Sequence, residues 1–133
     1  MLFRSGTAAT INSGATLEIS AGSSVSITFG GATGKLTLDH STTFTGEIIG
    51  LTGTGSPASS DQIDLKDIAF GAGTTESFSG NSVGGTLTVS DAAHDTASIA
   101  LVGNYTASTF TLSNDGSGDT LISILSPAAP GRR

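Results

Sequence analysis

Oxygen-bearing side chains near the end of the chain form the strongest candidate for a metal site. Asn114, Asp115 and Asp119 lie in the segment Asn-Asp-Gly-Ser-Gly-Asp, where the glycines allow the positive φ angles of a tight loop. Calcium binds amide and carboxylate oxygens, so these three residues are the predicted metal ligands. The segment lacks the full spacing and the terminal glutamate of an EF-hand, and Asn-Asp-Gly is also typical of a hairpin. A plain turn is therefore the preferred interpretation, with calcium as the alternative.

Three further carboxylates, Asp61, Asp64 and Asp67, are spaced three residues apart. On a helical turn they would share one face and could bind a hard cation. The stretch 64–70 is also the best candidate for a short helix, since its apolar residues would fall on one helical face. The favoured interpretation is that Asp61 caps a turn, that Asp64 points outward between two apolar residues, and that Asp67 is solvated.

The histidines do not stand in a catalytic motif. His40 follows Asp39 and His94 precedes Asp95, but no Gly-x-Ser-x-Gly elbow accompanies them. The glycine-rich stretches lack the lysine of a phosphate-binding loop, and the glutamates show no spacing typical of a glycosidase pair. The chain has no cysteine, so a disulfide scaffold and a cysteine zinc site are excluded. We therefore expect no enzymatic activity and no cofactor.

The composition describes an acidic chain with few charges. Lysine and arginine number 5 against 11 aspartates and glutamates, which gives a formal net charge of −6 at pH 7. Such a surface repels phosphate groups, so binding to nucleic acid is not expected. The apolar runs are too short to cross a bilayer, so no membrane insertion is expected. Met1–Arg4 is followed at once by polar residues, so no signal peptide is expected and export would depend on another signal.

Short segments in which polar and apolar residues alternate must position these candidate residues. Alternation with a period of two indicates β-strands with one buried and one wet face. The expected strands lie at residues 16–20, 24–29, 35–39, 62–65, 86–89, 98–101, 109–112 and 121–125. The side chains expected to point into the core are those of Leu17, Ile19, Val25, Ile27, Leu36, Leu38, Ile63, Leu65, Leu87, Val89, Ile99, Leu101, Phe110, Leu112 and Ile122.

The strands fall into two zones of one continuous domain. We predict β-strand-repeat coils over residues 1–53, a loop over 54–60, a C-terminal β unit over 61–126 and a flexible tail over 127–133. In the first zone a glycine, a small residue and alternating aliphatics recur, which favours an all-β, parallel β-solenoid or β-roll-like fold with short turns and little helix. The alternative is a β-sandwich, whose core usually holds bulky aromatics, whereas this chain has no Trp and one Tyr.

Residues 61–124 contain the segments DQIDLKDIAFG, FSGNSVGGTLTVSD and ASIALVGNYTASTFTLSNDGSGDTLI. This stretch resembles the C-terminal β-domain of large secreted bacterial proteins, especially rhizobial-type β-strand-repeat and adhesin-like proteins. It is also similar in layout to the domain after the calcium β-roll of serralysin-type proteases. The resemblance implies a parallel β-solenoid or β-roll, secretion, and a structural, surface or export-associated role. It does not imply an enzymatic activity for this segment. The tandem calcium repeat of the β-roll is absent, so calcium-driven folding is not implied.

The sequence thus predicts a non-enzymatic structural or self-association module of a secreted or cell-surface bacterial protein, of the adhesin or matrix type. The alternative is a polysaccharide- or calcium-binding accessory module of a secreted enzyme. An open solenoid end exposes unpaired backbone groups, so a homo-oligomer or an end-to-end assembly is expected. The contact would be strand pairing or an apolar strip of Phe3, Ile11 and Phe29.

Overall fold

The computed structural model describes residues 8–19, 25–31, 33–51, 53, 60–103, 105 and 108–125. Within them the chain is built from strands, and one 3-10 turn, η1 (Ser41–Thr43), is the only helical element. The all-β expectation with little helix is therefore confirmed for this part of the chain. The strands are β1 (Ala8–Ile11), β2 (Thr16–Ile19), β3 (Ser26–Phe29), β4 (Lys35–Leu38), β5 (Glu47–Ile49), β6 (Gln62–Ala69), β7 (Thr75–Gly80), β8 (Gly84–Ser90), β9 (Thr96–Val102), β10 (Thr109–Asn114) and β11 (Asp119–Leu125).

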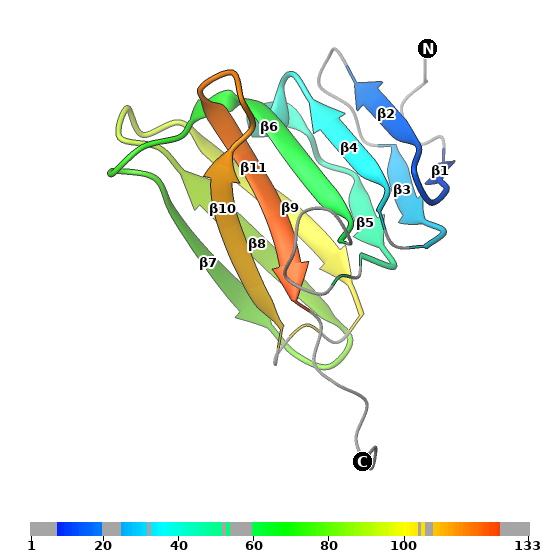
Figure 1. Ribbon diagram of the computed structural model, residues 1–133. Helices are drawn as coiled ribbons and strands as arrows, with labels where there is room; N and C mark the ends of the chain where they lie inside the picture. Colours follow the sequence, from blue (N-terminus) through cyan, green and yellow to red (C-terminus); the bar gives the residue numbers. More distant parts are fainter. Residues whose placement is uncertain are drawn as a thin grey trace, which may run out of the picture.

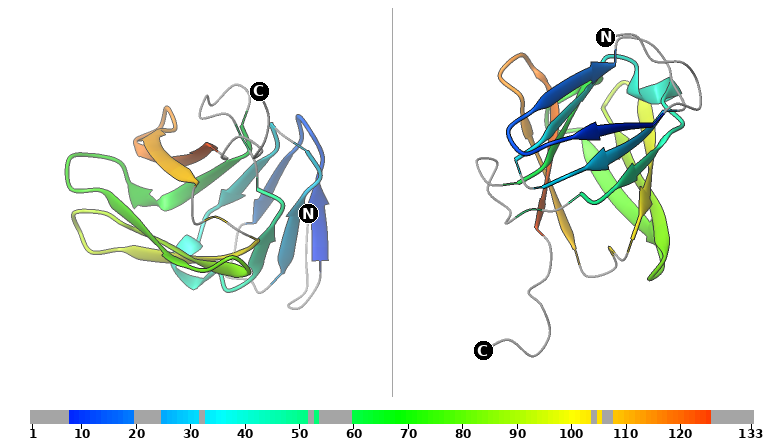
Figure 2. Two further views of the ribbon diagram at one scale, coloured as in Figure 1. Left: turned by 90° about the horizontal axis from the view of Figure 1, so that it is seen from below. Right: turned by 90° about the vertical axis from the view of Figure 1, so that its right-hand side faces the viewer.

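Two mixed sheets lie face to face (Figures 1 and 2). Sheet A has the strand order β1-β3-β5-β9-β8-β7, and sheet B has the order β10-β11-β6-β4-β2. The strands β1 to β6 alternate between the two sheets, and those in the same sheet pair in parallel. The later strands form antiparallel hairpins, β7 with β8, β8 with β9, and β10 with β11. The described residues form no closed solenoid. A β-sandwich-like fold therefore fits the two mixed sheets as well as the predicted solenoid does.

The two halves share both sheets. Strand β6 pairs in parallel with β4 on one side and antiparallel with β11 on the other. Strand β9 likewise pairs in parallel with β5 and antiparallel with β8. Each sheet therefore runs without a break from the parallel half to the antiparallel half. The predicted loop and tail lie almost entirely outside the described residues.

The core lies between the sheets and follows the period-two pattern. All the side chains expected to point inward are buried except two, Leu17 and Leu112, which are partly buried and pack against the core. Phe44, Ile48 and Leu51 add further fully or nearly fully buried side chains. Burial of an aliphatic side chain contributes about 1.5–3 kcal/mol, so this apolar layer is the main source of stability.

Aromatic side chains fill the space between the sheets in the antiparallel half. Phe78 on β7 and Phe110 on β10 have ring centroids 5.7 Å apart, and Tyr105 lies 6.2 Å from Phe110 and 6.4 Å from Phe78. The hydroxyl of Tyr105 donates a hydrogen bond to the carbonyl of Leu51 at 2.9 Å. This cluster gives the antiparallel half the bulky aromatic core that is typical of a sandwich.

The short helix expected over residues 64–70 is wrong, because this stretch belongs to β6. Gln62–Leu65 pairs with β4 on one side and with β11 on the other, and Ala69 pairs with Asp119 of β11, which outweighs the local preference for a turn. Opposite it the register jumps, since Thr120 pairs with Leu65 while Asp119 pairs with Ala69. The irregularity lets both Leu65 and Ile68 reach the core, three residues apart. Apolar residues three apart are also typical of one face of a helix, which is why the sequence predicted a helix here.

Candidate functional site

Two carboxyl groups and two lysines meet on the outer face of sheet B. The Nζ of Lys66 lies 3.1 Å from Asp115 Oδ2 and 3.6 Å from Asp64 Oδ2. The Nζ of Lys35 also lies 3.6 Å from Asp64 Oδ2. The side chains of Asp64 and Asp115 are only 2% and 1% exposed, whereas both lysines are 34% exposed. We call these four residues the Asp64–Asp115 cluster.

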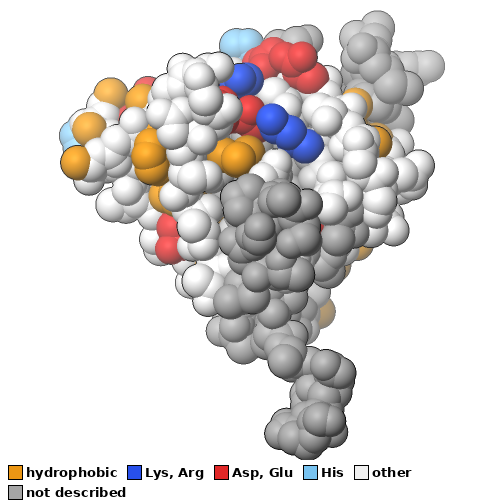
Figure 3. Space-filling view, in the orientation of Figure 1, with side chains coloured by type: hydrophobic (Ala, Val, Ile, Leu, Met, Phe, Trp, Pro, Cys, Tyr) orange, Lys and Arg blue, Asp and Glu red, His pale blue; other side chains and the backbone are white. Residues whose placement is uncertain are grey.

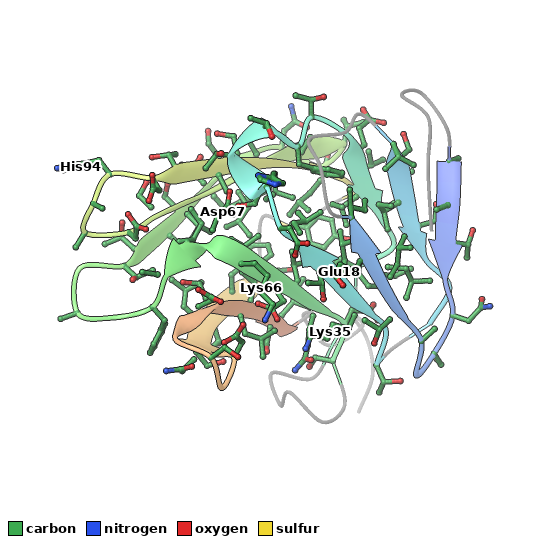
Figure 4. The ribbon with its side chains drawn as sticks, turned by 90° about the horizontal axis from the view of Figure 1, so that it is seen from above. Glu18, Lys35, Lys66, Asp67 and His94 are labelled. Atoms are coloured by element: carbon green, nitrogen blue, oxygen red, sulfur yellow. The ribbon has the colours of Figure 1, made fainter. Side chains whose placement is uncertain are left out.

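Local strand geometry places the cluster on one face. Ile63 and Leu65 point into the core, so Asp64 between them and Lys66 beyond them point outward. Lys35 comes from the neighbouring strand β4, and Asp115 comes from the β10–β11 turn. In Figure 4, Lys35 and Lys66 lie beside that hairpin. Figure 3 shows basic and acidic side chains gathered at the upper end of this face, in a surface that is otherwise mostly uncharged.

The β10–β11 turn is held by its own side chains. Asn114 Oδ1 accepts the amides of Gly116 (2.8 Å) and Gly118 (3.1 Å). Asp115 Oδ1 accepts the amides of Ser117 (2.7 Å) and Asp119 (3.2 Å). Both glycines have positive φ, 98° and 90°, as the turn requires. The contacts are those of the plain turn that was the preferred interpretation of this segment.

The predicted calcium ligands share this turn, but the side-chain oxygens of Asn114 and Asp115 have other partners. Asn114 Oδ1 and both oxygens of Asp115 accept hydrogen bonds from the turn amides or from Lys66. Within the described residues, no group of three or more histidine, aspartate or glutamate side chains is placed to hold a metal ion. Calcium binding at Asn114, Asp115 and Asp119 stays a prediction.

The two buried carboxyls have opposite pKa shifts. Burial, a hydrogen bond with Asp115 and the charge of Asp115 raise the pKa of Asp64 to about 6. Burial alone would also raise the pKa of Asp115, but hydrogen bonds with Asp64, Ser117 and Lys66 lower it far below its ordinary value. The Asp64 Oδ1 atom has no hydrogen-bond partner when the carboxyl is ionised. Leaving a buried oxygen without a partner costs free energy, and protonation of Asp64 removes this cost because the protonated carboxyl donates a hydrogen bond to Asp115.

The other two carboxylates of the 61–67 series do not join the cluster. Asp61, which is fully buried, accepts the amide of Gly34 at 2.9 Å. Asp67 accepts the hydroxyl of Ser41 and the amide of Thr42, and so caps the η1 turn. The helical face that would have brought Asp61, Asp64 and Asp67 together is absent because the stretch is a strand. Asp67 stays partly exposed and makes these contacts at the surface.

Asp91 is a structural residue that sequence reasoning missed. Its Oδ1 accepts the amides of Ala93 (2.9 Å) and Asp95 (3.0 Å) in the β8–β9 turn, and its Oδ2 accepts the amide of Ala69 on β6 (3.0 Å). The hydrogen bond from Ala69 and those from the turn lower the pKa of Asp91. A signal was present in the sequence, since an aspartate directly after a strand is typical of an Asx turn.

The two histidines lie on exposed turns. His40 precedes the η1 turn, and His94 lies at the tip of the β8–β9 hairpin with a φ of 69°. Figure 4 places His94 at the left edge of the view, away from Lys35 and Lys66 of the cluster. The structure thus does not bring His94 together with the buried carboxyls.

Comparison with known proteins does not assign the chain to a family. No family model matches it, and no curated protein or solved structure matches it either. No helix among the described residues is long and apolar enough to cross a membrane.

Proposed function

We propose that this chain is a non-enzymatic structural and self-association module of a secreted or cell-surface bacterial protein, of the adhesin or matrix type. The observation that carries the proposal is the end of the molecule formed by β1 and β2. Strand β1 is an edge of sheet A, and β2 is an edge of sheet B. Figure 2 (right) looks onto this end, where both strands lie side by side.

The parallel half supports a solenoid interpretation of residues 8–69. Each strand pairs with the strand two further along the chain, so that Ala8 lies opposite Ser26 and Thr16 opposite Lys35. A chain that alternates between two sheets with parallel pairing follows the path of successive solenoid coils. A coil of this kind leaves its face and its edges open until another coil or another molecule covers them.

Both edge strands are only four residues long, and Glu18 on β2 is their one charged residue. Strands β1 and β2 contain no lysine and no proline, and their register with β3 and β4 shows no bulge. Two copies related by a twofold axis would pair these edges in the antiparallel direction. The proposed contact is therefore backbone pairing rather than an apolar strip. Ile11 and Phe29 are only 1% and 4% exposed, so the strip expected from them is wrong, and Phe3 lies outside the described residues.

Proline variants test the edge contact without disturbing the core. The carbonyls of Ile11 and Ile19 bind the neighbouring strands, so the backbone groups of Thr10 and Glu18 point to the open side. We expect the wild-type chain to form a dimer or larger assembly in size-exclusion chromatography with light scattering. A Thr10→Pro and Glu18→Pro double variant should be a monomer, and a Thr10→Val and Glu18→Gln control should still assemble. A monomeric wild type at high micromolar concentration would overturn the proposal.

The antiparallel half offers an observation for polysaccharide binding as the second candidate. Hydroxyl side chains lie in register across β7, β8 and β9 on the outer face of sheet A, in the rows Ser77–Thr88–Ser98 and Thr75–Ser90–Thr96. Neutral hydroxyl rows can form hydrogen bonds with a sugar chain. Affinity electrophoresis in gels containing neutral polysaccharide would show retardation, and a Thr88→Val and Ser98→Ala variant should reduce it.

A further inference from the structure

We propose that Lys66 and Asp115 condense spontaneously to an amide cross-link, with Asp64 carrying protons between them. The proposal is independent of the assembly proposed above, because all three residues belong to one chain. It would make this pair a self-catalysed modification site that ties strand β6 to the β10–β11 turn.

The reacting groups are already in contact. The Lys66 Nζ lies 3.1 Å from Asp115 Oδ2, and the Asp115 side chain is 1% exposed. The fold already holds the amine against the carboxyl, so the reaction does not have to overcome the entropy cost of bringing two separate molecules together. The carboxyl is shielded from water, which limits the competing return to free acid.

The backbone around Asp115 can stabilise the charge that develops during the attack. As the nitrogen adds to Cγ, negative charge increases on the carboxyl oxygens. Asp115 Oδ1 already accepts the amides of Ser117 (2.7 Å) and Asp119 (3.2 Å). Two preorganised backbone donors on one oxygen have the geometry of an oxyanion hole.

Asp64 is placed to exchange protons with both partners. Its Oδ2 lies 3.6 Å from the Lys66 nitrogen, which in turn lies 3.1 Å from Asp115 Oδ2. Its side chain is 2% exposed, and its buried Oδ1 has no hydrogen-bond partner. The raised pKa of Asp64, about 6, allows it to take up and release a proton near neutral pH.

The atoms balance without any other reactant. The Lys66 ammonium transfers a proton to the Asp64 carboxylate and becomes a neutral amine. Its lone pair forms the N–Cγ bond, and the nitrogen then loses a second proton. Both protons reach the departing Asp115 oxygen by way of Asp64, the Cγ–O bond breaks, and one water molecule leaves. Asp64 returns to its starting state, and the ion pair of Lys66 and Asp115 becomes a neutral amide.

Intact-mass spectrometry of the purified wild-type chain under denaturing conditions is the decisive measurement. We expect a mass lower than that of the sequence by one water molecule, and a digest containing a branched peptide that joins Lys66 to Asp115. A Lys66→Arg variant keeps the positive charge and an Asp64→Asn variant keeps the shape of the shuttle, yet both should show the full mass. The matched control Lys35→Arg should still lose water, because Lys35 contacts Asp64 and not Asp115.

The sequence Asp115-Gly116 offers another way to lose water, by closing a succinimide ring. The two products differ, because a succinimide opens in mild alkali and joins no distant residues, whereas the amide survives and links two peptides. A full-mass wild type after prolonged incubation in the folded state would overturn the proposal. A water loss that maps to Asp115 and Gly116 alone would overturn it as well.

Discussion

Asp91 at the end of sheet A accepts the backbone amide of Ala69 in sheet B at 3.0 Å, so one carboxylate joins the two sheets. The same side chain holds the β8–β9 turn through Ala93 and Asp95. Three backbone donors thus depend on one residue in the described structure. Hydrogen bonds of this kind, with a charged acceptor, are stronger than those between neutral groups.

Replacing Asp91 should therefore loosen both the turn and the contact between the sheets. We expect Asp91→Ala to lower the melting temperature by several degrees, because three amides lose their acceptor. Asp91→Asn should have a smaller effect, since its carbonyl oxygen can still accept. Differential scanning calorimetry would measure both, with Glu76→Gln on the exposed part of β7 as the control. Equal melting temperatures for Asp91→Ala and the wild type would show that the contact is unimportant.

Leu87 and Leu112 should differ in their contribution to the core. Leu87 is fully buried, whereas Leu112 only packs against the core from β10. Leu87→Ala should reduce the free energy of unfolding by about 2–5 kcal/mol, and Leu112→Ala should cost less. Urea titration would measure the two losses, with Thr88→Ala on the opposite face of β8 as the control. A larger loss for Leu112→Ala would mean that the inward faces have been assigned incorrectly.

The pKa of Asp64 makes stability depend on pH in a defined direction. Its folded pKa is about 6, above the ordinary value of 3.8, so its stabilising contribution is complete below the lower value and is lost as pH rises through the upper one. Between about pH 4 and pH 7 the loss should be up to roughly 3 kcal/mol relative to a variant that cannot ionise.

This pH effect is best measured in a Lys66→Arg background, which keeps the positive charge and cannot form the amide. The stability of this variant should be compared with that of a Lys66→Arg and Asp64→Asn double variant by urea unfolding at several pH values. The free energy of unfolding of the Lys66→Arg variant should fall relative to that of the double variant as pH increases. A difference that does not change with pH would contradict the raised pKa.

Calcium should leave the stability of the chain unchanged. The Asp115 oxygens accept hydrogen bonds from two amides and from Lys66, so a cation would have to displace that ammonium. Millimolar calcium should therefore not shift the melting temperature. A rise that disappears in Asp115→Ala and Asp119→Ala variants would establish the predicted calcium site instead.

Part of the candidate site could be predicted from the sequence. The alternation around Ile63 and Leu65 predicted that Asp64 points away from the core. The residues from Asn114 to Asp119 could be identified as a turn. The burial of Asp64 and its approach to Asp115 could not be predicted. They arise because β11 and β4 lie on either side of β6, and that pairing joins residues far apart in the chain.

The sequence by itself determined the strand-rich class and the inward faces of the strands that it predicted, because alternation with a period of two is a local property. Strands β1, β5 and β7 were not among the predicted strands. Only the tertiary structure decided which strands became neighbours. Strand β9 lies beside β5, although three strands separate them in the chain, and β11 lies beside β6. Many strand orders would bury the same aliphatic faces, so local patterns do not distinguish them. The packing of Phe78, Tyr105 and Phe110 between the sheets depends on this strand order, because it brings the three rings together.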